Sequence, residues 1–358
     1  MATLSLCMIV KDEESVLKRC LDSISPLVDE IIIADTGSSD ATREIAALFT
    51  DKIYDFPWID DFSAARNFSF SKASMDYIMW MDADDVFDMA FSEKFTSFKD
   101  AGFDGADTVM MPYETSFDEK GEAVFSYYRE RILKRSRGFL WQGRVHEAVS
   151  GRGFAVYSDI PIKHKSQKTS YSDRNLRIYE KQISEGAPLS PRDTFYYGRE
   201  LYYHKSYYAA VGVLKGFLHM DDGWKENKIE ACRILSSCSL ALNNPQKALK
   251  ELFTSFLWDS PRAEVCCDIG QIFVNLSDYE KAVFWYESAL RIPEDRRSGA
   301  FVSADAYGYL PYIQLCVCFD RLGDRRKAEE YNKMAGACRP RSEAYLKNLQ
   351  YFASLSGK

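Results

Sequence analysis

The chain has 358 residues, of which 46% are hydrophobic and 28% are charged, so it has the length of about two domains and the composition of a globular protein. Its formal net charge of −7 argues against a dedicated nucleic-acid binder, and the absence of a long apolar run predicts no membrane-spanning helix. Nine scattered cysteines without a CxxC pair, and an N-terminal apolar run with no basic segment before it, favour a cytoplasmic protein with reduced thiols.

The first half of the sequence alternates strand-length apolar runs with helical patterns. In chain order we expect a strand at Leu4–Val10, a helix over 16–24, a strand at Glu30–Asp35, a helix over 41–49, a strand near Ile53, a helix over 61–71 and a strand over 77–81. This alternation predicts a mostly parallel sheet that is covered on both faces. Two further strand patterns, 109–113 and 124–134, flank the turn sequence Asp118-Glu119-Lys120-Gly121 and predict an antiparallel hairpin.

From about residue 171 onward the strand signal ends and helical periodicity takes over. Four small residues each stand 12 positions before an alanine, in the pairs Gly198 and Ala210, Ser236 and Ala248, Gly270 and Ala282, and Cys316 and Ala328. The alanines are spaced 38, 34 and 46 residues apart, and 34 is the period of a tetratricopeptide repeat. We expect each small residue to let the alanine of the next helix approach, and the longest gap to hold an insertion over 295–304. The sequence thus predicts an α/β domain over 1–170 and an all-α repeat domain over 171–358.

Polar residues follow the predicted strands, where ligands bind to an open parallel sheet. In chain order they are Lys11, Asp12 and Glu13, then Asp35, then Arg66 and Asn67, then Asp82 and Asp84. No GxGxxG follows the first strand and no GxxxxGK[ST] occurs, which disfavours a dinucleotide dehydrogenase and a P-loop NTPase. The aspartates predict instead a nucleotide site that handles diphosphate through Mg²⁺ or Mn²⁺.

Three segments resemble the signatures of family 2 glycosyltransferases with the GT-A fold, namely 8–14, 33–42 and 80–85. The segment 62–67 is similar to the diphosphate-contacting segment of that family. Together with the repeats, the pattern resembles bacterial peptide and protein glycosyltransferases of the sublancin S-glycosyltransferase type. The resemblance implies a Rossmann-like α/β domain with a mixed sheet. Asp12 departs from it, since the family most often has Asn there, and many relatives have a longer catalytic domain.

The resemblance also implies a role for individual residues. Those implied to contact the nucleotide sugar are Val10, Lys11, Glu13, Asp35, Arg66 and Asp82. Those implied to hold the metal are Asp82, Asp84 and His164. For catalysis, Glu147 is implied as the general base with His146 beside it, near the diphosphate. Asp85 is the rival base, and its plain structural alternative is to cap a following helix.

The implied reaction is the metal-dependent, inverting transfer of a sugar from a nucleotide donor, UDP-glucose or UDP-GlcNAc, to a Ser, Thr or Cys of a polypeptide. The repeats would present the acceptor, because helical repeats form extended binding surfaces. Three alternatives stay open: a lipid-linked or polysaccharide acceptor with the repeats as a homodimer interface, a non-catalytic repeat scaffold with a degenerate transferase domain, and nucleotidyl transfer. The intact Asp82-Ala83-Asp84 and Arg66 oppose the scaffold, and a first loop without Gly or Arg enrichment opposes nucleotidyl transfer.

Overall fold

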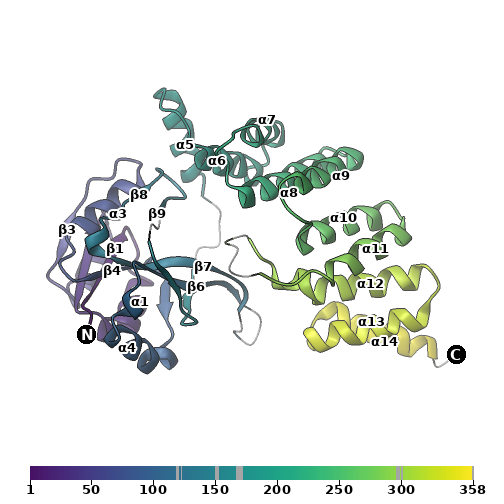
Figure 1. Ribbon diagram of the computed structural model, residues 1–358, viewed down its shortest axis with the longest axis horizontal. Helices are drawn as coiled ribbons and strands as arrows, with labels where there is room; N and C mark the ends of the chain where they lie inside the picture. Colours follow the sequence, from purple (N-terminus) through teal and green to yellow (C-terminus); the bar gives the residue numbers. More distant parts are fainter. Residues whose placement is uncertain are drawn as a thin grey trace. The chain divides into compact units, whose positions relative to one another are not determined.

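The computed structural model in Figure 1 describes residues 1–117, 121, 123–149, 153–166, 172–295, 299 and 301–356. Its internal contacts divide the chain into two compact units, Met1–Leu189 and Ser190–Lys358. The first unit extends beyond the boundary expected at 170, because helix α5 (Arg174–Ser184) belongs to it. No helix among the described residues is long and apolar enough to cross a membrane.

The first unit is built around a mixed sheet. Within the described residues its strands are β1 (Leu4–Val10), β2 (Glu30–Asp35), β3 (Ile53–Asp55), β4 (Tyr77–Trp80), β5 (Asp85–Phe87), β6 (Thr108–Phe117), β7 (Ala123–Lys134), β10 (Ala155–Tyr157) and β11 (Ile162–His164). Their order is β3-β2-β1-β4-β7-β6-β11-β5, with β10 also beside β6. Strands β1 to β4 run parallel, whereas β7 is antiparallel to both of its neighbours. This confirms the predicted α/β domain with an antiparallel addition.

Helices cover both faces of the sheet. They are α1 (Leu17–Ile24), α2 (Thr42–Ala46), α3 (Phe62–Ser71) and α4 (Ser92–Asp100). Strand β1 is apolar at every position except Ser5, because both of its faces are buried: Leu4, Leu6 and Met8 enter one core cluster with α1, while Cys7 enters a second cluster with Phe70 of α3. A central parallel strand is buried on both faces, so its sequence does not alternate between apolar and polar residues.

Most predicted elements of this unit appear close to their expected bounds, and the helix expected over 41–49 is the clearest exception. It is regular only over Thr42–Ala46. Beyond it, the amide nitrogens of Leu48 and Phe49 donate to carbonyls three residues earlier, so the chain tightens into a turn. The turn residues Asp118 to Lys120 of the predicted hairpin lie outside the described residues, while the strands that flank them, β6 and β7, pair as expected.

The second unit consists of antiparallel helix pairs, which confirms the predicted repeats. In the part of the chain that is described, the pairs are α6 (Pro191–Tyr203) with α7 (Tyr207–Leu218), α8 (Lys225–Ala241) with α9 (Pro245–Thr254), α10 (Ala263–Asn275) with α11 (Tyr279–Ala289), and α12 (Tyr309–Arg321) with α13 (Arg325–Cys338), followed by α14 (Glu343–Ser356). The predicted insertion over 295–304 falls between α11 and α12, and its residues 296–298 and 300 lie outside the described part.

The repeat alanines are fully buried, as expected, but the glycines of the first helices face other partners. A Cβ on Gly198 would stand 2.5 Å from Leu214, and one on Gly270 would stand 2.9 Å from Tyr286. Each partner lies four residues after the repeat alanine, one turn further along the second helix. The expectation that the small residue admits the alanine was therefore wrong for these two pairs, in which it admits a larger side chain.

We expect Gly198→Ala to destabilise the protein by about 1–3 kcal/mol, because the added methyl group overlaps Leu214. The matched control is Gly212→Ala on α7, where nothing lies within 4 Å of the added Cβ. That change should stabilise by about 0.5–1 kcal/mol, since alanine loses less conformational freedom in a helix. Denaturant unfolding followed by circular dichroism measures both, and equal stabilisation by the two substitutions would contradict the close packing at Gly198.

Candidate active site

The loops after β1 and β2 are bonded to each other. The backbone nitrogen of Asp12 donates to Ser38 Oγ at 3.1 Å, and Asp12 Oδ1 accepts from the nitrogen of Ser39 at 2.8 Å. The nitrogen of Glu13 donates to Thr42 Oγ1 at 2.8 Å. Asp12 has a φ of 52°, in the left-handed region that Asn and Asp tolerate best among residues with a side chain. The departure from Asn at this position is therefore compatible with the local backbone.

The residues implied for the nucleotide lie together at this edge of the sheet. Val10 and Asp35 end neighbouring strands and are partners in the β1–β2 register. Asp35 is buried and accepts from Ser38 Oγ at 2.5 Å and from Arg43 Nη1 at 3.1 Å. Its carboxylate is thus held in place by its own loop, while Lys11 is exposed.

Arg66 connects three segments that are far apart in the sequence. From α3, whose first turn Asp61 caps, its Nε donates to Glu147 Oε1 at 2.6 Å and its Nη2 donates to Asp82 Oδ1 at 2.7 Å. The guanidinium also lies 5.0 Å from the ring of Trp80. Burial by itself would lower the pKa of Arg66, but Asp82 and Glu147 outweigh it and raise that pKa, so the guanidinium stays charged.

The two carboxylates on Arg66 differ in exposure. The side chain of Asp82 is 34% exposed and that of Glu147 is 11% exposed. Burial raises the pKa of Asp82, but the charges of Arg66 and Arg131 outweigh it and hold that pKa below the ordinary value for Asp. Asp82 is therefore an ionised, partly accessible carboxylate at the end of β4, as expected of a group that contacts a ligand.

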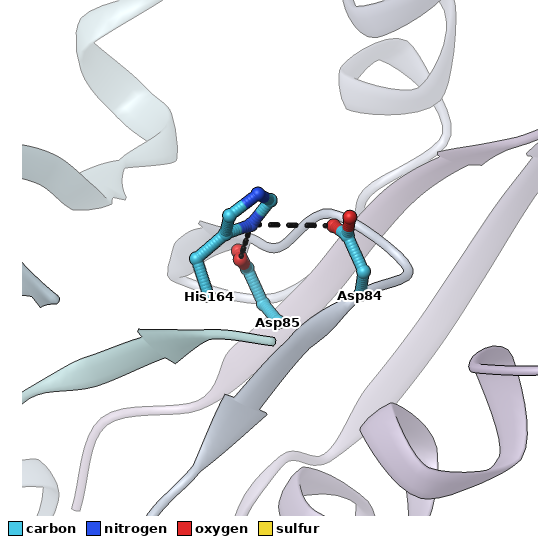
Figure 2. A group of neighbouring side chains, drawn as sticks. All are labelled: Asp84, Asp85 and His164. Atoms are coloured by element: carbon cyan, nitrogen blue, oxygen red, sulfur yellow. Dashed lines mark hydrogen bonds and ion pairs between the residues drawn. The ribbon is translucent and has the colours of Figure 1, made fainter. Parts of the chain in front are cut away.

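Asp84, Asp85 and His164 form a second group, shown in Figure 2. His164 ends β11 and Asp85 begins β5, and the two residues are partners in the antiparallel pairing of these strands. His164 Nδ1 lies 3.2 Å from Asp85 Oδ1 and 3.4 Å from Asp84 Oδ1. The structure thus unites Asp84 with His164, which are 80 residues apart, but it adds Asp85 rather than Asp82 to the group.

Asp85 is fully buried and is held by several donors. Arg131 Nη1 lies 3.0 Å from its Oδ2, Tyr113 OH donates to its Oδ1 at 2.9 Å, and the nitrogen of Asp82 donates to Oδ2 at 3.1 Å. A carboxylate in this position cannot meet an acceptor substrate, so Asp85 as the rival base is disfavoured. The helix-capping alternative was wrong, because Asp85 begins a strand.

The group fits a divalent cation through Asp84 and His164. Their side chains are 14% and 30% exposed, whereas the oxygens of Asp85 are already taken up by protein donors. The ring nitrogen of His164 that faces both carboxylates in Figure 2 is Nδ1, which lies 3.4 Å from Asp84 Oδ1, so a cation between these two atoms would contact both. Burial and the nearby Asp82 and Asp85 raise the pKa of Asp84, a cost that a bound cation would relieve.

Two arginines of the antiparallel addition were missed by the reasoning from sequence. Arg131 and Arg129 on β7 lie 3.8 Å and 4.9 Å from the ring of Trp80, on which Arg66 also converges. Arg131 is fully buried and pairs with Asp85. The available signal was the spacing of two arginines at alternate positions of a predicted strand, which places both on one face of the sheet.

The loop that carries Glu147 is supported by α5. His146 has a φ of 51°, which is unusual for a residue with a side chain. The hydroxyl of the buried Tyr179 on α5 donates to the carbonyl of Val145 at 3.3 Å, and Arg144 Nη1 pairs with Glu185 at 2.8 Å. A helix that follows all the residues implied for the site therefore helps to position Glu147.

The family comparison agrees with this geometry. Residues 5–158 match glycosyl transferase family 2, and residues 263–296 match a tetratricopeptide repeat. The family match contains β1, β2, β4, Arg66 and Glu147, whereas α5 lies beyond its end.

Curated relatives resemble parts of the chain. Glycosyltransferase SunS of Bacillus subtilis is 26% identical over 263 residues, which are 68% of this chain and 60% of that protein. A tetratricopeptide repeat-containing protein of Synechococcus elongatus is 51% identical over 85 residues, 24% of this chain and 21% of that protein. Glycosyltransferase GlyA of Streptococcus pneumoniae is 26% identical over 221 residues, 58% of this chain and 30% of that protein. The chain thus spans between a fifth and three fifths of the length of these relatives. Residues 5–158 form a family 2 glycosyltransferase domain, and a tetratricopeptide repeat follows it in the same chain.

Proposed function

We propose that this protein is a metal-dependent, inverting glycosyltransferase that moves a sugar from a UDP-linked donor, UDP-glucose or UDP-GlcNAc, to a Ser, Thr or Cys side chain of a polypeptide. The observation that carries this proposal is the pair of ion pairs of Arg66, which connect Glu147 to Asp82. Asp82 in turn stands two residues before Asp84 of the group with His164. The proposed base, the arginine proposed to bind the diphosphate and the proposed metal ligands would thereby come together from segments that are far apart in the sequence.

The donor would bind across the ends of β1, β2 and β4, with its nucleoside toward Asp35 and its diphosphate toward Asp82 and Asp84. Mg²⁺ or Mn²⁺ held there by Asp84 and His164, with Asp82 alongside, would stabilise the negative charge on the leaving diphosphate. Arg66 would add N–H donors for the phosphate oxygens, because a guanidinium has five and two serve the bonds to Glu147 and Asp82.

Arg66 also links donor binding to the base. Without a donor, Glu147 Oε1 accepts from Arg66 Nε at 2.6 Å. Diphosphate oxygens would compete for the same guanidinium and so weaken its bond to Glu147. Glu147 would then take the proton of the acceptor as it attacks the anomeric carbon. Direct displacement inverts the configuration and needs no second carboxylate as a nucleophile.

The acceptor class is supported by the second unit. Stacked helix pairs form an extended surface suited to a polypeptide, and no such array is needed to bind a small acceptor. Tyrosines of α6, among them the half-exposed Tyr203, add aromatic surface of the kind that peptide-binding sites use.

The test is to incubate the protein with UDP-glucose or UDP-GlcNAc, with Mn²⁺, Mg²⁺ or EDTA, and with matched Ser and Cys polypeptides or a lipid-linked acceptor. We expect metal-dependent release of UDP, and a sugar on the polypeptide by mass spectrometry. Transfer to the lipid-linked acceptor alone would contradict the polypeptide assignment, and no UDP release from any nucleotide sugar would contradict the enzyme assignment.

A chain that ends at Leu189 should keep slow hydrolysis of the donor, because water can replace the acceptor, but should lose glycosylation of polypeptides. A chain that ends at 170 lacks α5, so it should lose hydrolysis as well, since Tyr179 no longer supports the loop of Glu147. UDP release and peptide mass, each compared with the full chain, separate the two results. Polypeptide glycosylation at the full-length rate by the Leu189 chain would show that the repeats do not hold the acceptor.

A further inference from the structure

The segment Phe301–Tyr307, called the strap here, lies against the first helices of the preceding repeats. Its first three residues have no regular secondary structure, and its last four, Ala304–Tyr307, form a short 3-10 helix that leads into α12. Val302 is 5% exposed, and with Phe301 and Tyr307 it borders a cavity of about 20 Å³ whose other walls include Ile229 and Arg233 of α8. The side chain of Val302 is thus buried against a helix more than 60 residues earlier in the sequence.

Polar contacts hold the strap to α10. Both oxygens of the buried Glu264 are taken up by it, since Oε1 accepts from the backbone nitrogen of Ser303 at 2.8 Å and Oε2 accepts from Tyr307 OH at 3.1 Å. Ser303 has an extended backbone conformation. The guanidinium of Arg199 on α6 lies 5.5 Å from the ring of Phe301. The strap therefore contacts the first helices of three successive pairs.

These contacts are those of a bound peptide. The extended backbone at Ser303 donates its N–H to the carboxylate of Glu264, the branched apolar side chain of Val302 is buried beside a small cavity, and the ring of Phe301 lies near a guanidinium. A surface with these features takes an extended polypeptide of the pattern aromatic, branched apolar, polar. The strap supplies that pattern as Phe301, Val302 and Ser303.

We propose that the surface of α6, α8 and α10 that the strap contacts binds an extended segment of the polypeptide acceptor, and that the strap occupies this surface as an internal competitor. The identity of the polypeptide as the acceptor rests on the proposed function above. A tethered segment competes at an effective concentration in the millimolar range, so an acceptor must displace it before it can bind.

Val302→Asp tests the proposal, because it replaces an apolar side chain that is 5% exposed with a carboxylate, and the cost of burying that charge should release the strap. The probe is a fluorescent peptide of residues 301–307, Phe-Val-Ser-Ala-Asp-Ala-Tyr, followed by anisotropy with the full chain. We expect it to bind the variant at least about tenfold more tightly than the wild type. Adding Glu264→Gln to the Val302→Asp variant should abolish this gain in affinity for the peptide. Phe284→Ala, an exposed site on α11, is the control and should bind like the wild type.

Equal binding of the peptide to the wild type and to a folded Val302→Asp variant would overturn the proposal. Should that variant not fold, the milder Val302→Ala/Tyr307→Phe double variant replaces it, with a gain of several-fold expected and no gain overturning the proposal. The assay contains no donor, so its outcome is independent of catalysis. Strap competition without sugar transfer would contradict only the proposed function, and transfer without strap competition would contradict only this inference.

Discussion

Asp84→Asn is expected to reduce sugar transfer by about 10²-fold or more without loss of the fold. The substitution removes a carboxylate ligand, and a metal ion at a phosphate leaving group supplies several kcal/mol of charge stabilisation. Stability should be unchanged or improved in the absence of metal. Burial and the neighbouring Asp82 and Asp85 raise the pKa of Asp84, so the folded state favours the neutral carboxyl and the charge opposes folding near neutral pH.

Two measurements on this variant separate a metal ligand from a structural carboxylate. Mn²⁺ should raise the melting temperature of the wild type and raise that of Asp84→Asn much less, because only a competent site binds the ion in the folded state. Asp88→Asn is the matched control, since Asp88 pairs with Lys163 close to the group but is not part of it. It should keep both the Mn²⁺ response and the activity. Full wild-type activity in EDTA would refute the metal assignment.

Glu147→Gln should lower transfer to a Ser acceptor by about 10²–10⁴-fold, the usual contribution of a positioned general base. Glutamine keeps an oxygen that can accept from Arg66, so the substitution removes basicity while it preserves the bond that orients the loop. A Cys acceptor should lose much less, because a thiol with a pKa of about 8.5 is already partly ionised near neutral pH.

The rates on matched Ser and Cys polypeptides are to be measured from pH 6 to 9. With the Cys acceptor, the rate of the variant should rise with pH as the thiol ionises in solution. Glu329→Gln serves as the control, because Glu329 also pairs with an arginine, Arg325, but lies on α13 of the second unit. Near wild-type rates of Glu147→Gln on Ser would mean that the base lies elsewhere. Asp85 is not the alternative, because it is fully buried beneath Arg131 and Tyr113.

The amino-acid sequence by itself determined the order and type of most elements and the register of the repeats. Strands β1 and β2 appear with their expected bounds, because a strand buried on both faces needs a mostly apolar run, which the local sequence pattern reveals. The repeat alanines, such as Ala210 and Ala282, are fully buried as their spacing predicted, because each contact between paired helices recurs with the repeat period. These features depend on interactions that are short-range or periodic.

Tertiary structure alone decided which side chains meet. Arg66 and Glu147 are 81 residues apart, and their bond depends on how α3 and the loop before β9 (Ala148–Val149) pack on the sheet. Likewise, Asp85 became a buried support of His164 because β11 pairs with β5, a neighbour that no local pattern specifies. The contact of the strap with Glu264 likewise depends on packing between residues far apart in the sequence, which no local pattern specifies. Such pairings follow from strand order and helix stacking, which depend on the whole chain. The separate motifs therefore indicated which chemical groups the site contains, but not which of these groups contact one another.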